Sequence, residues 1–235
     1  MIHLHLFVEG RTELNFVLRI LQPFLGYDRY TLFPIQTVTK QDEKRGRIHK
    51  GGFVRGSGSY EKVKKQINNR TKECNKKQEK HVFTTMFDFY ALPSCFPGYT
   101  EAEKIADPYS KVKKLEESLG KDIDDYRFIP YIQLHEFEAM IFVDSGQLIH
   151  EYPERASEIL SLSSVLEERN VNGNPELINE DPTTAPSKRI IAQIPGYDKA
   201  KANASVNTVE KIGIDAIRKQ CPHFNEWLYK LENLK

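Results

Sequence analysis

The stretch His3-Leu4-His5-Leu6-Phe7-Val8-Glu9-Gly10-Arg11-Thr12-Glu13 decides the fold class of this chain. Residues 2–8 are β-branched, aromatic or apolar with partial alternation, which predicts a strand. Gly10 predicts a turn after this strand. We expect a helix from Thr12, a good N-cap residue, because an apolar stripe at helical spacing follows it. The stretch therefore predicts a strand, a turn and a helix in direct succession.

Glu9 and Glu13 are placed by this prediction at the end of the strand and in the first turn of the helix. Binding sites of open α/β sheets form at that edge. Two carboxylates that lie close together repel each other unless something neutralises them, and Mg²⁺, which prefers oxygen ligands, is a common choice. The alternative is a surface turn that carries two solvated glutamates.

Composition is typical of a soluble globular chain. Its 235 residues suffice for one large or two small domains, and 39% are hydrophobic and 29% charged. No apolar run approaches the ~18 residues of a transmembrane helix, and no secretory signal is visible. Cys74, Cys95 and Cys221 are widely spaced and odd in number, which favours a reduced, cytoplasmic location over a disulfide framework or a zinc site.

Charge is distributed unevenly along the chain. Residues 40–81 hold fourteen Lys and Arg against five Asp and Glu, a local net charge of +9 in a chain whose total is +1. Residues 40–59 combine several glycines with basic side chains, which predicts a basic loop that could order on nucleic acid. The alternative is a solvated loop followed by a helix with solvated lysines.

Strands and helices are expected to alternate through the first part of the chain. We predict further strands over 30–38, 82–87 and 127–134, and helices over 60–74 and 109–119, the latter ending at Gly120. The remainder is helical, with helices over 154–168, after Pro186, and over 206–234 with a break at Pro222. The predicted fold is α/β: a mostly parallel four-strand sheet flanked by helices, in a domain of residues 1–150, with a helical C-terminal subdomain, residues 151–235, packed on it.

Further acidic side chains follow the later strands. Asp88 comes directly after strand 82–87, so it could join Glu9 in a metal site, or serve as an Asx-turn or helix cap. Glu136 and Glu138 follow strand 127–134; they could complete the metal shell or favourably occupy a first helical turn. His135 could act as a general base, donate a hydrogen bond to a metal ligand, or be a satisfied boundary histidine.

Lys188 and Arg189 open the helix after Pro186. Two cations at a helix start oppose the helix dipole, so we expect an anionic partner. A phosphate or one of the glutamates would serve.

The order of strands and helices, with Glu9 after the first strand and Asp88 after the third, resembles the Toprim fold of topoisomerases, primases, recombination mediators and OLD-type nucleases. The first Toprim motif, a strand ending in Glu-Gly and followed by Thr-Glu, reads Phe7 to Glu13 here. The second motif, Asp-x-Asp, reads Asp88-Phe89-Tyr90. Tyr90 thus stands in place of the second Asp, so a two-metal site would need Glu136 or Glu138.

The chain is still more similar to one bacterial family of Toprim-like proteins of unknown function. Four stretches carry this resemblance: 88–93, 135–139, 186–189 and 221–227. It implies a partner ATPase of the ABC or SMC-like type, in a phage-defence or DNA-repair context.

Two functional hypotheses result. The first is a metal-dependent nuclease that binds Mg²⁺ or Mn²⁺ and hydrolyses DNA or RNA. Its metal ligands would be Glu9, Glu13, Asp88, Glu136 and Glu138, with Lys188, Arg189 and His135 as further catalytic residues. The second is a non-catalytic subunit of an ATPase, in which Glu9 and Asp88 pair with Lys188 and Arg189. Strand transfer or primase-like synthesis is a third, less favoured class.

Overall fold

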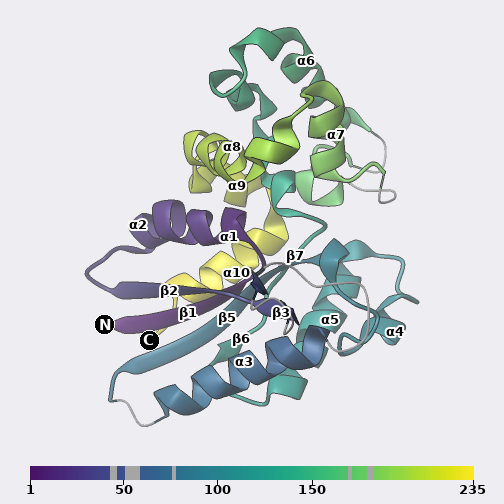
Figure 1. Cartoon of the computed structure of the whole chain (residues 1–235). Helices are drawn as coiled ribbons and strands as arrows, with labels where there is room; N and C mark the ends of the chain where they lie inside the picture. The colour runs from purple at the N-terminus through teal and green to yellow at the C-terminus, as the bar shows by residue number, and fades with distance from the viewer. Residues whose placement is uncertain (43–46, 51–58, 76–77, 169–170, 179–182) are drawn as a thin grey trace. The chain divides into compact units, whose positions relative to one another are not determined.

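The computed structural model describes residues 1–42, 47–50, 59–75, 78–168, 171–178 and 183–235, with the backbone alone for 38–42 and 47–50 (Figure 1). The chain divides into two compact units, Met1–Ile132 and Gln133–Lys235. The division predicted from the sequence was at residue 150. Residues 137–150 belong to the second unit because their two short 3₁₀ helices pack against a long helix there.

The first unit is built on a mostly parallel sheet, as predicted. Its strand order is β2-β1-β5-β6, and β7 also pairs with β5. The strands are β1 (Ile2–Val8), β2 (Tyr30–Gln36), β5 (Lys80–Asp88), β6 (Phe128–Ile129) and β7 (Ile132–Gln133). Strand β1 lies between β2 and β5 and runs parallel to both, so apolar residues cover both of its faces.

The predicted fourth strand is two short strands. Pro130 interrupts it between β6 and β7, because proline has no N–H to give to a neighbouring strand. Instead, the Tyr131 N–H donates to Thr85 Oγ1 at 2.9 Å, and the Thr85 hydroxyl donates to the Tyr131 carbonyl at 2.8 Å. Five strands therefore pair in this sheet where four were predicted.

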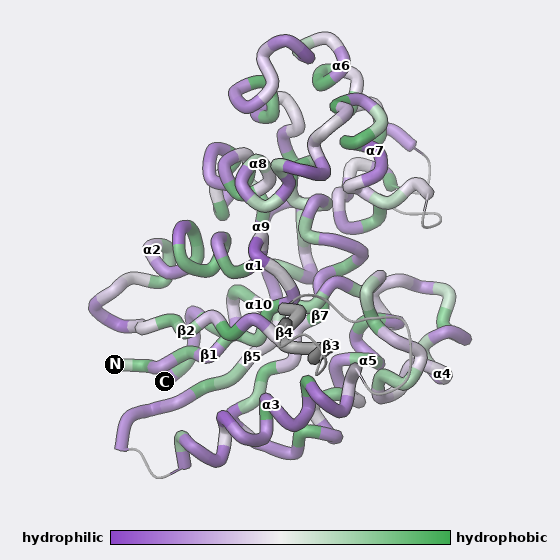
Figure 2. The backbone as a smooth tube through the Cα atoms, in the orientation of Figure 1, coloured by the Kyte–Doolittle hydropathy of each residue, from purple (hydrophilic) through white to green (hydrophobic). Residues whose placement is uncertain are grey.

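Helices cover both faces of this sheet (Figure 1). One face carries α1 (Arg11–Phe16), the π-helical turn η1 (Val17–Leu21) and α2 (Gln22–Leu25); the other carries α3 (Ser59–Cys74) and α5 (Pro108–Ile123). Figure 2 shows the α3 trace alternating between hydrophilic and hydrophobic residues, as expected for a helix with one buried face. Its apolar residues Val63 and Ile67 are fully buried.

Three sequence predictions for this unit need correction. The first helix begins at Arg11 with Gly10 as its N-cap, not at Thr12. Helix α5 continues through Gly120 and ends at Ile123, where Asp124 adopts the left-handed conformation (φ 52°). The strands β3 (Val38–Asp42) and β4 (Arg47–Lys50) form an antiparallel pair that extends into the segment 40–59 predicted as a basic loop; residues 43–46 and 51–58 lie outside the described part.

The second unit consists largely of helices, as predicted. They are the 3₁₀ helices η3 (Phe137–Val143), η4 (Ser145–His150), η5 (Pro153–Arg155), η6 (Leu162–Glu167) and η7 (Pro175–Leu177), and the α-helices α6 (Ala156–Ser161), α7 (Pro186–Gln193), α8 (Tyr197–Ile212), α9 (Ile214–Gln220) and α10 (Pro222–Glu232). The predicted breaks before Pro186 and at Pro222 are present. The buried Glu176 carboxylate accepts the N–H groups of His223 and Phe224 at 3.0 and 2.9 Å and so caps α10.

In the first unit the short helices η2 (Phe89–Ala91) and α4 (Tyr99–Ala102) complete the secondary structure of the described residues. Among the residues that the structure describes, in both units, no helix has the length and apolar character needed to cross a membrane.

Candidate strand-end site

Glu9 and Asp88 lie at the carboxyl ends of two neighbouring parallel strands, β1 and β5. The register pairs Val8 with Met86, so both acids come just beyond the last paired residues. The Asp88 N–H donates to Glu9 Oε1 at 2.9 Å, and only 7% of Glu9 is exposed. The fold therefore places the Glu9 carboxylate against the Asp88 backbone, at the sheet edge where the sequence predicted both acids.

Glu13 lies beside them, in the first turn of α1. Its Oε2 accepts the Gly10 N–H at 2.7 Å, so the side chain folds back over the turn that follows Glu9. A carboxylate in this position also interacts favourably with the amino end of the helix. One oxygen of Glu9 and one of Glu13 are thus held by backbone N–H groups at the same corner of the sheet.

The three acids Glu9, Glu13 and Asp88 do not form a closed cage of ligands for a metal ion. Within the described residues, Glu9, Glu13 and Asp88 do not bring three ligand atoms to within 4.8 Å of one another. Mg²⁺ usually keeps several waters and binds one or two carboxylates, so a magnesium site does not require three protein ligands. Tyr90, in η2, supplies a phenol where the Toprim motif has its second Asp, and so offers no second carboxylate from this turn.

The other candidate residues belong to the second unit. His135 has a positive φ of 63° and is buried, and Glu136 forms the N-cap of η3. Glu136 Oε2 accepts the Ser187 N–H at 2.9 Å, at the first turn of α7. Glu136 thus places a negative charge at the start of a helix, where the dipole favours it.

Glu138 is completely buried and has partners on both oxygens. Lys201 Nζ lies 2.9 Å from Oε2, and the Ser205 hydroxyl donates to Oε1 at 3.1 Å. The Tyr197 hydroxyl lies 2.6 Å from the Ser205 hydroxyl. Burial raises the pKa of Glu138, while the ammonium of Lys201 opposes that rise. These contacts give Glu138 the surroundings of a buried ion pair.

Lys188 and Arg189 differ in their surroundings. Arg189 forms a two-pronged ion pair with Glu168, at 2.6 and 2.8 Å, and its Nε donates to the Thr184 carbonyl at 2.8 Å. We expected an anionic partner for both cations. For Arg189 this partner is a glutamate, Glu168. Lys188 is exposed to solvent.

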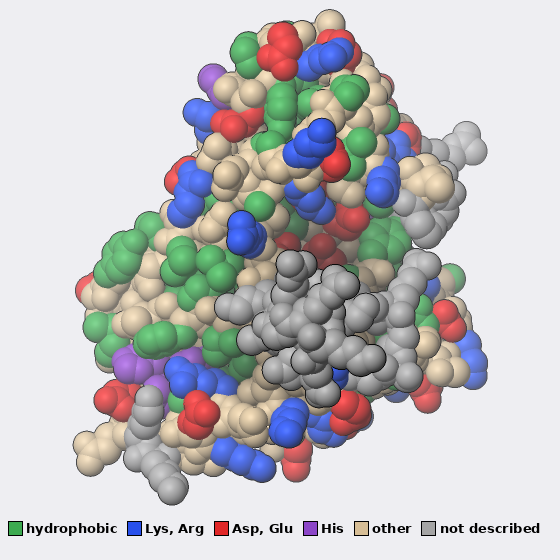
Figure 3. All heavy atoms as spheres, in the orientation of Figure 1, with side chains coloured by type: hydrophobic (Ala, Val, Ile, Leu, Met, Phe, Trp, Pro, Cys, Tyr) green, Lys and Arg blue, Asp and Glu red, His purple; other side chains and the backbone are tan. Residues whose placement is uncertain are grey.

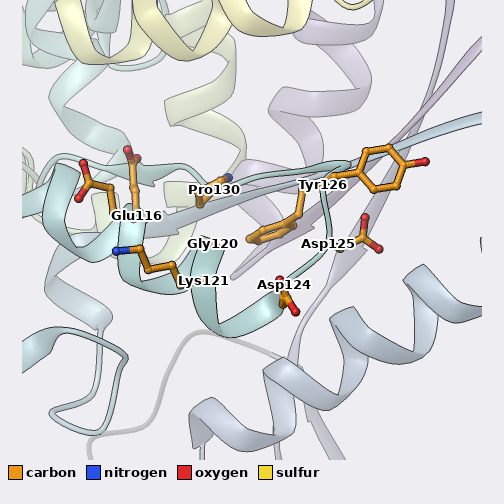
Figure 4. A pocket seen from close by; sticks show the side chains of 9 residues that line it. Glu116, Gly120, Lys121, Asp124, Asp125, Tyr126 and Pro130 are labelled. Atoms are coloured by element: carbon orange, nitrogen blue, oxygen red, sulfur yellow. The ribbon is translucent and has the colours of Figure 1, made fainter.

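A shallow pocket of the first unit does not coincide with these residues (Figure 4). Its lining is Glu116, Glu117, Gly120, Lys121, Asp124, Asp125, Tyr126, Phe128 and Pro130. Glu116 Oε1 accepts the Ile132 N–H at 2.8 Å and Asp125 pairs with Arg127 at 2.6 Å, so two of its acids serve structural contacts. The pocket is therefore no candidate for the catalytic site.

One chemically distinctive cluster was not predicted from the sequence. His5, Cys74 and His81 are buried together, with one ligand atom of each within 4.8 Å of the others. Cys74 and His5 are 69 residues apart in sequence, so no metal-binding spacing pointed to them. The only available signal was the position of His5 within the first predicted strand and of His81 directly before the strand predicted over 82–87.

Together, the sheet and its strand-end acids define an α/β protein with a carboxylate site at the carboxyl edge of parallel strands. A family model described as "Domain of unknown function (DUF4276)" matches residues 8–232. The chain therefore belongs to this family, and the match spans both units. Comparisons with curated proteins and with solved structures gave no significant match.

Proposed function

We propose that this protein is a Mg²⁺-dependent nuclease of Toprim-like fold that hydrolyses phosphodiester bonds at Glu9 and Asp88. One observation carries the proposal: the Asp88 N–H binds Glu9 Oε1 at 2.9 Å, which holds two acids at the carboxyl ends of adjacent parallel strands. Ligands of open α/β sheets bind at this edge. Mn²⁺ would serve in place of Mg²⁺, since both prefer oxygen ligands.

Each acid has a distinct task in this proposal. Glu9 is oriented by the Asp88 backbone and would bind the metal through its carboxylate, and Asp88 would add the second carboxylate. Glu13, bonded to the Gly10 N–H, would fix the turn that follows Glu9. The bound ion would supply Lewis-acid activation of the phosphate and of a water molecule.

Basic side chains would hold the nucleic acid. Lys62, Lys65 and Lys72 are exposed on α3, in the same unit as Glu9 and Asp88. They would contact phosphates with little sequence preference. Lys188 is also exposed and could bind phosphate, whereas Arg189 is occupied by Glu168.

A second candidate is a non-catalytic subunit of an ABC or SMC-like ATPase. The ion pairs of Glu138 with Lys201 and of Arg189 with Glu168 favour it, because they give a predicted metal ligand and a predicted catalytic residue a structural partner. Tyr90 also favours this second candidate, because it stands at the position where the Toprim motif has its second Asp. In this case, Glu9 and Asp88 would only fix the strand ends.

Cleavage assays test the first proposal against the second. Single-stranded DNA, double-stranded DNA and tRNA would be incubated with the protein and Mg²⁺ or Mn²⁺, with and without an ATPase of this type. Glu9→Gln and Asp88→Asn should each lower metal-dependent cleavage by at least about a hundredfold, since even supporting residues of metal sites can contribute that much. Glu9→Gln retains Oε1 as acceptor for the Asp88 N–H, so folding should be preserved.

Glu117→Gln is the matched control, because Glu117 is an exposed acid on α5. It should leave cleavage unchanged. If the wild-type protein cuts no substrate under any of these conditions, the nuclease proposal is wrong and the subunit role is favoured.

A further inference from the structure

A buried cluster of His5, Cys74 and His81 lies at the amino-terminal side of the sheet. Its members come from three elements: the middle of β1, the last residue of α3 and the start of β5. Cys74 and His81 are at most 4% exposed and His5 is fully buried. Figure 3 shows histidine side chains gathered close to the beginning of β1.

The separations between these side chains are close to those of zinc ligands. His5 Nε2 lies 2.9 Å from His81 Nδ1 and 3.7 Å from Cys74 Sγ. Tetrahedral zinc with its usual bond lengths sets nitrogen–nitrogen separations of about 3.3 Å and sulfur–nitrogen separations of about 3.6 Å. The nitrogen–nitrogen separation is therefore about 0.4 Å shorter than zinc requires, and the sulfur–nitrogen separation agrees to about 0.1 Å.

The surroundings of the cluster suit a metal with imidazole and thiolate ligands. Glu79 Oε2 lies 3.8 Å from His81 Nε2, the position of the carboxylate that often orients a metal-binding histidine. The His5 ring stacks between Phe33 and Phe83, with centroid separations of 5.0 and 4.9 Å, which fixes its plane.

Arg70 stabilises an arrangement of the cluster without metal, which would compete with zinc binding. Its Nε donates to His5 Nδ1 at 3.3 Å, and since arginine has no acceptor, the proton of a neutral His5 must then lie on Nε2. That proton points to His81 Nδ1. Coordination through His5 Nε2 moves the proton to Nδ1 and displaces Arg70, whose side chain already reaches Glu73 at 3.1 Å.

We propose that His5, Cys74 and His81 bind one zinc ion, which joins the end of α3 to β1 and β5. Two imidazoles and a thiolate select zinc over magnesium. His81 precedes Asp88 by seven residues on the same strand, so about 23 Å of strand separates this ion from the proposed magnesium site. The proposal is therefore independent of the nuclease assignment.

Metal binding to the intact protein is the direct test. Purified chain should contain about one zinc per molecule by elemental mass spectrometry. After removal of zinc, Co²⁺ should produce tetrahedral absorption bands and a thiolate charge-transfer band. Cys74→Ser and His81→Gln should each weaken Co²⁺ binding at least about tenfold. Arg70→Gln should bind about tenfold more tightly, because one competing hydrogen bond is removed.

Cys95→Ser is the matched control, because Cys95 is the exposed cysteine of the same unit, and it should leave the spectrum unchanged. A wild-type protein that binds Co²⁺ without the charge-transfer band would overturn the proposal. So would binding that survives Cys74→Ser, or that weakens in Arg70→Gln. The wild-type spectrum decides the matter even if a variant fails to fold, which circular dichroism would reveal.

Discussion

Glu138 shows at the scale of a single residue how burial changes an acid's role. It is 0% exposed, and Lys201 and Ser205 bind its two oxygens. A charge removed from water in this way is stable only when paired. Breaking such a pair costs more than the pair itself contributes, since a buried charge is then left without a partner.

The pH dependence of stability should carry the signature of Glu138. Burial raises the pKa of Glu138 in the folded state above its value in the unfolded chain. Its contribution to stability is therefore fully present below the ordinary glutamate pKa of about 4.3 and is lost as pH rises through the folded value. As pH rises through this range, the free energy of unfolding of the wild-type protein should fall relative to that of Glu138→Gln. Urea unfolding at a series of pH values measures the difference.

Glu136→Gln is the comparison for this experiment, because Glu136 is only half-buried in the same segment. It removes a carboxylate from the same segment without emptying a fully buried position. A constant stability difference between wild type and Glu138→Gln from acid to neutral pH would contradict the prediction.

Arg127 joins several elements of the first unit. Its guanidinium forms a two-pronged pair with Asp125, at 2.9 and 2.6 Å, and donates to the Thr71 carbonyl at 3.2 Å and to Asn75 Oδ1 at 2.6 Å. It also lies 5.0 Å from the centre of the Phe83 ring. The end of α3 is thereby tied to β5 and to the loop before β6. Hydrogen bonds from Arg127 hold the pKa of Asp125 below its usual range.

Arg127→Lys should lower the free energy of unfolding by about 2 kcal/mol, because an ammonium cannot reproduce the planar fork or its stacking. Urea denaturation checks the value. Arg155→Lys provides the control: Arg155 forms a more exposed pair with Glu158 at 3.1 Å, and its replacement should cost less than about 0.5 kcal/mol. Equal decreases in the two variants would show that the Arg127 contacts carry no special stability.

Charge asymmetry is the property of the whole molecule that bears most directly on function. Residues 40–81 carry a net charge of +9 while the chain as a whole carries +1. Within this segment, the described side chains of α3 leave Lys62, Lys65 and Lys72 exposed. A concentrated positive charge of this kind attracts nucleic acid over a distance set by the salt concentration.

Replacing Lys62, Lys65 and Lys72 together by Gln should weaken nucleic-acid binding and reduce its dependence on salt. The slope of log affinity against log salt should fall by about one for each phosphate that the variant no longer neutralises. Filter binding or fluorescence anisotropy at several salt concentrations measures both effects.

The matched control replaces Lys104, Lys113 and Lys121, which are also exposed in the first unit but lie outside the basic segment. The change in net charge is identical. If both triple variants bind equally weakly, binding depends on total charge and not on α3.

The sequence by itself determined the class of fold and the placement of Glu9 and Asp88 at one edge of the sheet. Apolar strands such as 2–8 and 82–87 are recognisable locally, and the ends of parallel strands must share one edge. Helix boundaries were less well determined: Gly120 lies inside α5, because the tertiary packing of Leu119 and Ile123 outweighs the low helix propensity of glycine.

Only the tertiary structure decided which polar groups became partners. The partners in these contacts are distant in sequence, and local patterns carry no information about them. They are Lys201 with Glu138, Glu168 with Arg189, and Cys74 with His5 and His81. Their meeting depends on how helices close over the sheet and over one another. Burial then fixed their chemistry, because a polar group without water must bind another polar group or an ion.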